Sequence, residues 1–338
     1  MTKPSATPPS TSANTPSSTL PNSAPRINAV VIGRNEGARL LACLASLASQ
    51  VSRLIYVDSG STDGSAEAAR AMGVEVVDLD MSLPFTAARA RNAGLQRLHQ
   101  EDGFVQLVDG DCEVAAGWIP QASRFLQQHP EVAVVCGRRR ERFPAASLYN
   151  QLCDTEWDTP IGEAKACGGD ALMRLEALRA VKGYRADLIA GEEPEMCLRL
   201  RQKGWKIWRI EAEMTLHDAQ MTRFGQWWKR SRRAGYAYAQ GAALHGGPPE
   251  RHWVTETRRA LLWGGVLPLL LLLAMLVITP WIGLAAAIYP LQLLRLTARM
   301  GLRPAWFSLL GKFAECSGVV EFGWNLLRGR NRTLIEYK

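Results

Sequence analysis

The sequence FVQLVDGD, residues 104–111, joins a short apolar run to two aspartates that are separated by one glycine. The apolar part is typical of a buried strand, and the polar part begins where that strand is expected to end. Ligands of open α/β sheets bind at the carboxyl ends of the strands. Two carboxylates at such an end, Asp109 and Asp111, can turn toward one divalent cation, a hard ion that takes oxygen ligands and commonly bridges substrate phosphates. A turn without metal is the alternative, because Asp-Gly-Asp is also a common turn sequence.

The sequence around this stretch alternates between strand-like and helix-like patterns. Short runs rich in β-branched residues predict strands at 27–32, 54–57, 74–77, 104–108, 132–136 and 206–210, and apolar stripes predict helices near 40–47, 85–99 and 118–128. Such alternation is typical of βαβ units. We therefore expect an α/β domain with a mostly parallel, buried sheet.

The N-terminal residues and the cysteines indicate the cellular setting. Residues 1–25 hold six Pro and eleven Ser or Thr, so they bury little apolar surface, and we expect a disordered tail. This tail has no apolar run of the kind that a secretory signal requires. The seven cysteines are odd in number and none stands in a CxxC pair, which argues against a disulfide framework or a thiolate zinc site and favours a reducing, cytosolic setting.

The net charge of +8 is concentrated in the last third of the chain. Residues 221–338 carry +11 and residues 1–220 carry −3, so we expect no nucleic-acid partner for the first two thirds. The positive charge brackets a stretch of 35 residues, Ala260 to Leu294, that contains no Asp, Glu, Lys or Arg. One bilayer crossing takes about 20 apolar residues, and Thr279-Pro280 offers a break between two crossings, 261–279 and 280–294.

The flanks of this apolar stretch predict its topology. Basic residues lie on both sides, so both ends are expected in the cytoplasm, and residues 260–294 are expected to form a transmembrane hairpin. Residues 223–259, including Gln226–Arg230, are interpreted as a basic, aromatic juxtamembrane segment, and residues 295–338 as interfacial helices with a basic tail. A buried pair of soluble helices is the alternative, but seven of the eleven Trp fall at or after Trp227, which favours the membrane.

Further polar motifs follow the predicted strands in a defined order. Two loops, Gly33–Glu36 and Asp58–Ser65, follow the first two strands, although each also suits a helix cap. Along the chain come RARN at 89–92, DGD at 109–111, GGD at 168–170 and GEEPEMCLRLR at 191–201. Together, over residues 27–220, these motifs resemble the family 2 glycosyltransferases of the GT-A fold.

The resemblance implies a nucleotide-sugar-binding domain at residues 26–222, with site residues at the matching positions. The residues expected to bind the donor are Asn35, Glu36, Asp58, Arg91, Asn92, Asp109, Gly169 and Asp170. Asp109 and Asp111 match the family's Asp-x-Asp pair and, with His217, are expected to hold Mg²⁺ or Mn²⁺. Ser59 stands where the family commonly has a second acidic residue, which leaves that part of base recognition open.

The resemblance also implies a catalytic base. The family usually has Glu-Asp at the start of a late helix, with the Asp as general base, and this chain has Glu192-Glu193 there. Glu193 is in the base position, with Glu192 sharing the role as an alternative. Pro194 suits the first turn of a helix, whose positive end helps to keep an adjacent carboxylate ionised. A first-turn acid without a catalytic role is the other interpretation.

The implied reaction is inverting transfer of a sugar from a nucleotide-diphosphate sugar, with UDP as the expected nucleotide, to a hydroxyl of a saccharide acceptor in cell-surface polysaccharide or glycan biosynthesis. The membrane segment favours a lipid-linked acceptor, contacts with membrane lipids, and a catalytic domain on the cytoplasmic side of the inner membrane. Two alternatives stay open. One is a polyprenyl-phosphate sugar transferase, whose acceptor is already ionised, and the other is a non-catalytic membrane scaffold with the same fold.

Overall fold

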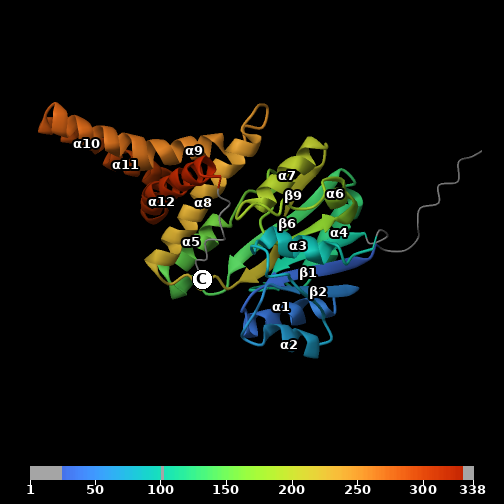
Figure 1. The fold of residues 1–338 in the computed structure, drawn as a ribbon. Helices are drawn as coiled ribbons and strands as arrows, with labels where there is room; N and C mark the ends of the chain where they lie inside the picture. Colours follow the sequence, from blue (N-terminus) through green and yellow to red (C-terminus); the bar gives the residue numbers. More distant parts are fainter. Residues whose placement is uncertain (1–24, 100–102, 330–338) are drawn as a thin grey trace, which may run out of the picture.

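The computed structural model describes residues 25–99 and 103–329. Its first part is a sheet covered by helices, and its second part is a group of long helices (Figure 1). Residues 1–24 of the expected N-terminal tail, and the last residues of the expected basic tail from 330 onward, lie outside the described residues.

A nine-stranded sheet forms the centre of the first part. Its order is β3-β2-β1-β4-β8-β6-β9-β5, with β7 also paired to β9. The strands are β1 Ile27–Gly33, β2 Arg53–Asp58, β3 Glu75–Asp78, β4 Phe104–Asp109, β5 Cys112–Val114, β6 Val132–Glu141, β7 Gly162–Ala164, β8 Ala171–Arg174 and β9 Lys206–His217. Because β8 is antiparallel to both β4 and β6, the strands β1 to β4, β6 and β9 run in one direction. The prediction of a mostly parallel α/β sheet is confirmed.

Helices cover the sheet through apolar faces. They are α1 Ala38–Ala48, α2 Ser65–Ala71, α3 Ala87–Leu95, α4 Trp118–Gln128, α5 Leu148–Glu156, α6 Leu175–Ala180 and α7 Glu192–Gln202, with a short 3-10 turn at Pro144–Ala146. In α4 the buried side chains include Trp118, Ala122 and Leu126, which recur every four residues and so share one face. In α3 a Cβ at Gly94 would lie 2.3 Å from Val30 Cγ1, so glycine lets this helix approach β1 closely.

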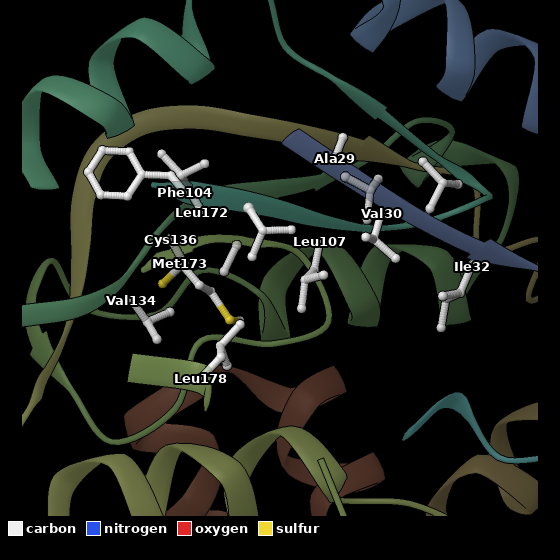
Figure 2. Packing of buried hydrophobic residues seen from close by; sticks show 14 of the residues in the cluster. Ala29, Val30, Ile32, Phe104, Leu107, Val134, Cys136, Leu172, Met173 and Leu178 are labelled. Atoms are coloured by element: carbon white, nitrogen blue, oxygen red, sulfur yellow. The ribbon is translucent and has the colours of Figure 1, made fainter. Parts of the chain in front are cut away.

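The core lies on both faces of the central strands. Residues 29–31 of β1 are fully buried in succession, which is the pattern of a strand covered by helices on both sides. Leu107 of β4 and the pair Leu172 and Met173 of β8 lie close together in the middle of this core (Figure 2). Burial of such side chains is the main stabilising contribution to the fold, about 1.5–3 kcal/mol for each large aliphatic side chain.

The register of the strands brings the polar loops to one edge. Gly33 pairs with Asp58 across β1 and β2, and Ile32 pairs with Asp109 across β1 and β4. The short strand β5 then runs antiparallel to the end of β9 and sets Cys112 opposite His217. Residues from both ends of the domain sequence therefore meet beside the Asp-Gly-Asp loop.

The second part consists of helices that pack on one another. They are α8 Phe224–His245, α9 Val254–Leu261, a π turn at Leu262–Val266, α10 Leu267–Val277, a 3-10 helix at Pro280–Ala287, α11 Ile288–Met300 and α12 Leu302–Leu327. The backbones of α8 and α12 touch through glycines, since a Cβ at Gly235 or Gly318 would lie 2.0 Å from the backbone of the other helix. Within residues 295–338, expected to form interfacial helices, α11 ends at Met300 and α12 follows as one long helix packed on α8.

Two continuous helical stretches in this part are long and apolar enough to cross a bilayer. They are Val254–Val277, which joins α9, the π turn and α10, and Pro280–Met300, which joins the 3-10 helix and α11. The chain reverses between them at Ile278 and Thr279, next to the predicted break, and the hydroxyl of Thr279 accepts a hydrogen bond from the N–H of Trp281. Both extend away from the sheet (Figure 1). Leu276, Val277 and Trp281 are 74%, 81% and 77% exposed, so apolar surface gathers at the tip of the hairpin.

Candidate functional site

A cavity of about 570 Å³ opens at the carboxyl edge of β1 and β4. Its lining includes Asn35 and Glu36 from the loop after β1, Asp109, Gly110 and Asp111 after β4, Arg139, Trp157 and His217, and Arg230 and Arg233 from α8. Of the predicted site residues, the structure brings Asn35, Glu36, Asp109, Asp111 and His217 into this cavity. The others lie behind its wall or outside it.

Asp111 and His217 form the part of the site best suited to a divalent cation. Asp111 is buried, and its Oδ2 lies 3.4 Å from Nε2 of His217. The other ring nitrogen, Nδ1, lies 3.7 Å from Oε2 of Glu141 and makes no hydrogen bond within residues 25–99 and 103–329. A proton on Nδ1, facing Glu141, leaves the Nε2 lone pair on the Asp111 side, which is the arrangement that carboxylates impose on metal-binding histidines. The carboxylate oxygens here suit Mg²⁺ or Mn²⁺.

Glu141 is held firmly behind His217. Its Oε1 accepts hydrogen bonds from Nδ2 of Asn150 and from the N–H of Phe143, and its Oε2 accepts one from the N–H of Ala219. Glu141 carries no local sequence signal, because it stands at the end of an otherwise ordinary strand and meets His217 only when β6 and β9 are paired.

Asp109 is fixed by a buried cation. Arg91, from α3, donates from Nη2 to Oδ1 of Asp109 and from Nη1 to Oε1 of Glu192, both at 2.7 Å. Burial works to lower the pKa of Arg91, but the charges of Asp109 and Glu192 outweigh it and raise that pKa. Arg91 therefore stays charged and links the Asp-Gly-Asp loop to the start of α7. It does not line the cavity.

Gly169 and Asp170 support the same aspartate from the other side. Oδ1 of Asp170 accepts a hydrogen bond of 3.0 Å from the N–H of Asp109, and its Oδ2 lies 2.8 Å from Nη2 of Arg139. A Cβ at Gly169 would lie 2.6 Å from Oδ2 of Asp109 and 3.1 Å from Nη2 of Arg91. A residue without a side chain is thus needed at 169 for Asp109 to stand where it does.

The loop after β2 is tied to the loop after β1. Oδ1 of Asn35 accepts a hydrogen bond from the N–H of Thr62, and the N–H of Asn35 donates to Oγ of Ser61. Asn35 adopts a left-handed conformation with φ of 56°, which asparagine tolerates better than most residues. Beside it, Oε2 of Glu36 lies 2.6 Å from Nη2 of Arg39.

Asp58 and Asn92 are engaged within the protein and do not line the cavity. The carboxylate of Asp58 accepts hydrogen bonds from the hydroxyl of Tyr56 and from the N–H groups of Gly60 and Ser61. Asn92 exchanges two hydrogen bonds with the backbone of Tyr184, at 2.7 and 2.9 Å, and so holds α3 to the loop before α7. Asp58 therefore fixes the turn after β2, and Asn92 fixes α3 to the chain at Tyr184.

Glu193 lies at the start of α7, directly after Gly191 and Glu192. Its Oε1 accepts hydrogen bonds from the N–H of Cys167 at 2.7 Å and from the thiols of Cys167 and Cys197 at 3.0 and 3.1 Å. Burial raises the pKa of Glu193, and the bonds from Cys167 and Cys197 offset part of that effect. Neither Glu192 nor Glu193 lines the cavity, since Glu192 points to Arg91 and Glu193 lies under the loop that carries Cys167.

Several lining residues were not predicted as site residues. Among them are Arg139 on β6, Trp157 directly after α5, and Arg230 and Arg233 on α8. The guanidinium of Arg139 lies 5.5 Å from the ring of Trp157, and that ring meets His217 edge-on at 4.8 Å. Arg230 donates to both carboxylate oxygens of Glu156, and Arg233 donates to the carbonyl of Ile189. The basic, aromatic run at Gln226–Arg230 lies close in sequence to His217. This proximity was the sequence signal that could have placed Arg230, and Arg233 three residues later, at the site.

Residues 29–161, which include most of these loops, match the family model described as glycosyl transferase family 2. This match confirms the resemblance to the family 2 glycosyltransferases that the motifs predict. Among curated proteins, the chain is 26% identical over 192 residues to the succinoglycan biosynthesis protein ExoA of Rhizobium meliloti, an alignment that covers 52% of this chain and 58% of that protein. It is 21% identical over 229 residues to the glycosyltransferase AglE of Haloferax volcanii, covering 64% and 74%.

The chain also resembles a solved structure. The mannosyltransferase PcManGT from Pyrobaculum calidifontis, solved in complex with GDP-Man and Mn²⁺, aligns over 90% of this chain and 89% of its own with a TM-score of 0.65 and 18% sequence identity. The likeness shows the fold, which is GT-A. Because it covers 90% of the chain, it continues past the family match into the C-terminal helices.

Proposed function

We propose that this protein transfers a sugar, with inversion at the anomeric carbon, from a nucleotide-diphosphate sugar to a hydroxyl of a saccharide acceptor. One observation carries the proposal. In a family 2 domain, two carboxylates and one imidazole, from Asp109, Asp111 and His217, converge on a cavity at the carboxyl ends of the strands. That edge is where open α/β sheets bind nucleotides.

Asp111 and His217, with Asp109 beside them, would hold Mg²⁺ or Mn²⁺. When bound, the cation supplies positive charge next to the diphosphate that leaves with the nucleotide. The protein's own part is to prepare the donor atoms. Glu141 orients the ring of His217, and the Arg91 pair orients the carboxylate of Asp109.

The other residues expected to bind the donor fall into two groups, those that face the cavity and those that support its loops. Asn35 and Glu36 face the cavity and would contact the nucleotide directly. Behind the cavity, these loops are held in place by hydrogen bonds and ion pairs of Asp58, Arg91, Asn92 and Asp170. Gly169 leaves the space that the carboxylate of Asp109 occupies. The solved mannosyltransferase carries GDP-Man, so both UDP and GDP are candidate nucleotides for this chain.

Glu193 is our candidate for the base that takes the proton of the acceptor hydroxyl. Glu192 is engaged with Arg91 at 2.7 Å, whereas Glu193 is held by an N–H and two thiols and has a raised pKa. A carboxylate whose pKa is raised toward neutrality accepts a proton more readily. To meet an acceptor, Glu193 needs the loop of Cys167 to shift, because it lies outside the cavity.

The acceptor is proposed to be a lipid-linked saccharide at the cytoplasmic face of the inner membrane, in polysaccharide or glycan biosynthesis. The apolar helices Val254–Val277 and Pro280–Met300 would anchor the protein, and basic residues flank them on both sides. The name of the succinoglycan relative supports an acceptor in polysaccharide synthesis.

A polyprenyl phosphate is the second candidate acceptor. Arg230 and Arg233 reach the cavity from α8, the helix that leads toward the apolar hairpin. A phosphate group entering from the membrane side would meet these two guanidinium groups, which suit phosphate oxygens. Such an acceptor is already ionised and requires no base.

The test is transfer of radiolabelled sugar into lipid extract, with wild type and Glu193→Gln. Label in a saccharide-lipid that Glu193→Gln no longer makes supports the hydroxyl acceptor. Label in a polyprenyl phosphate, made equally by both proteins, favours the second candidate. No transfer from UDP-sugars or GDP-sugars to any lipid or free saccharide would contradict both.

A further inference from the structure

The fold brings together two cysteines that stand 30 positions apart in the sequence. Cys167 lies in the loop before β8, and Cys197 lies one turn beyond Glu193 on α7. Their sulfur atoms are 3.7 Å apart, and Oε1 of Glu193 lies 3.0 and 3.1 Å from them. Sequence spacing argues against a thiolate metal site because it shows no CxxC pair, but tertiary contact supplies two thiols and a carboxylate at one point.

We propose that Cys167, Cys197 and Glu193 form a site for a soft divalent cation such as Zn²⁺, separate from the site at Asp111 and His217. Thiolate ligands select soft cations, whereas carboxylate oxygens suit the magnesium or manganese proposed beside the donor. The two sites differ in chemistry, so one protein can hold different cations at each.

The sulfur positions already match a tetrahedral site. With zinc–sulfur bonds of about 2.3 Å and tetrahedral angles, two sulfur ligands stand about 3.8 Å apart, close to the observed 3.7 Å. A sulfur and a carboxylate oxygen around the same ion stand about 3.6 Å apart, given a zinc–oxygen bond of about 2.1 Å. Glu193 therefore has to withdraw by about half an ångström, which rotation about its side-chain bonds allows.

The protons and charges balance without any other reagent. Both cysteines are free thiols. Two zinc–sulfur bonds form as two thiol S–H bonds break, and both protons go to solvent. Glu193 adds one carboxylate, and a water molecule can take the fourth position. Cys167 is only partly buried, so its side of the cluster offers the way in.

A zinc ion bound at this cluster would affect sugar transfer. The inference here rests on the proposed function, in which Glu193 takes the acceptor proton. A cation bound to that carboxylate withdraws it from proton transfer, so zinc is expected to inhibit sugar transfer at concentrations that leave donor binding intact. Replacing either thiol is expected to relieve this inhibition in any variant that retains activity.

The test uses Cd²⁺ as a spectroscopic substitute for zinc on the full-length protein in detergent. Cadmium bound to thiolates shows a charge-transfer band in the ultraviolet, whether or not the enzyme is active. We expect the band to saturate at one cadmium per chain, and to be lost in Cys167→Ser and in Cys197→Ser. It is expected to persist in Asp111→Ala, which removes the other candidate cation site.

Two control variants separate this cluster from other thiols. Cys153→Ser replaces a buried cysteine on α5, and Cys112→Ser replaces the one whose sulfur lies 3.6 Å from Asp111. Both should keep the band, with circular dichroism confirming that all variants fold. The proposal is overturned if no saturable band appears, if the band survives in both cluster variants, or if Cys112→Ser abolishes it. Because the readout is spectral, it fails or succeeds independently of transfer activity.

Discussion

Replacing Arg91 by methionine tests the network that holds the site together. The substitution removes the guanidinium group that Glu192, with a side chain only 11% exposed, shares with Asp109, with a side chain 30% exposed. Asp109 keeps a weaker ion pair, with Nη2 of Arg139 3.9 Å from its Oδ2. Breaking a buried ion pair costs about 3–5 kcal/mol. Water reaches part of Asp109, so we expect the lower part of that range, about 3–4 kcal/mol. For a domain of this size each kcal/mol lowers the unfolding temperature by about 2–4 °C, which predicts a fall of about 6–16 °C.

Thermal unfolding of the detergent-solubilised protein, followed by circular dichroism, measures this fall. Arg97→Met is the matched control, because Arg97 lies exposed just beyond α3, and it is expected to change stability by no more than about 0.5 kcal/mol. The reasoning is refuted if Arg91→Met lowers the unfolding temperature by less than about 2 °C, or if both variants fall equally.

Three further predictions follow from the packing and burial of single residues. Gly169→Ala places a Cβ 2.6 Å from Oδ2 of Asp109, so it should destabilise the protein by about 1–3 kcal/mol and weaken metal-dependent nucleotide binding; calorimetry showing wild-type affinity would contradict this. Burial raises the pKa of Glu193, which means that its ionised form is disfavoured in the folded state. Folding therefore favours the neutral form of Glu193, and the resulting contribution to stability is complete below the ordinary glutamate pKa of about 4.3. That contribution is lost as the pH rises through the raised pKa of the folded protein. Unfolding temperatures of wild type should thus fall relative to Glu193→Gln as pH rises, and a difference independent of pH would count against the raised pKa. Gly318→Val should separate α12 from α8 and increase proteolysis of the C-terminal helices, whereas Gly323→Val, with open space at its Cβ among the described residues, should not; equal proteolysis of the two would refute the close contact.

The parts of the structure that the sequence predicts are those with local signals. Residues 27–32 and 104–108 are short apolar runs followed by polar turns, and they form β1 and β4 with nearly the expected bounds. The reversal of the apolar hairpin near Thr279-Pro280 is equally local, because proline lacks the N–H that a continuing helix needs.

The parts that the sequence does not predict depend on long-range pairing. Strand β8 has only four residues and stands antiparallel between β4 and β6, and nothing in its own composition indicates that position. Strand β6 continues to Glu141 through three arginines, which the apolar pattern at 132–136 does not suggest. Glu141 therefore reaches His217 only through tertiary structure.

The same limit applies to the candidate site. The order of the motifs predicts one shared site for Asp109, Asp111 and His217. The structure brings all three to one cavity. The partners of Arg91 and Glu193 were not predicted, because which carboxylate of the Glu192-Glu193 pair faces Arg91 depends on the rotation of α7. The cluster of Cys167 and Cys197 was missed for the same reason, since it joins a loop and a helix.

Calorimetric titration of the detergent-purified protein with UDP and GDP, with and without Mn²⁺, tests the central claim most directly. The account predicts that one of the two nucleotides binds only when Mn²⁺ is present, and that Asp111→Ala abolishes this binding while the protein stays folded. Equal binding with and without Mn²⁺, wild-type affinity in Asp111→Ala, or no binding of either nucleotide would contradict a metal-dependent donor site at Asp109 and Asp111.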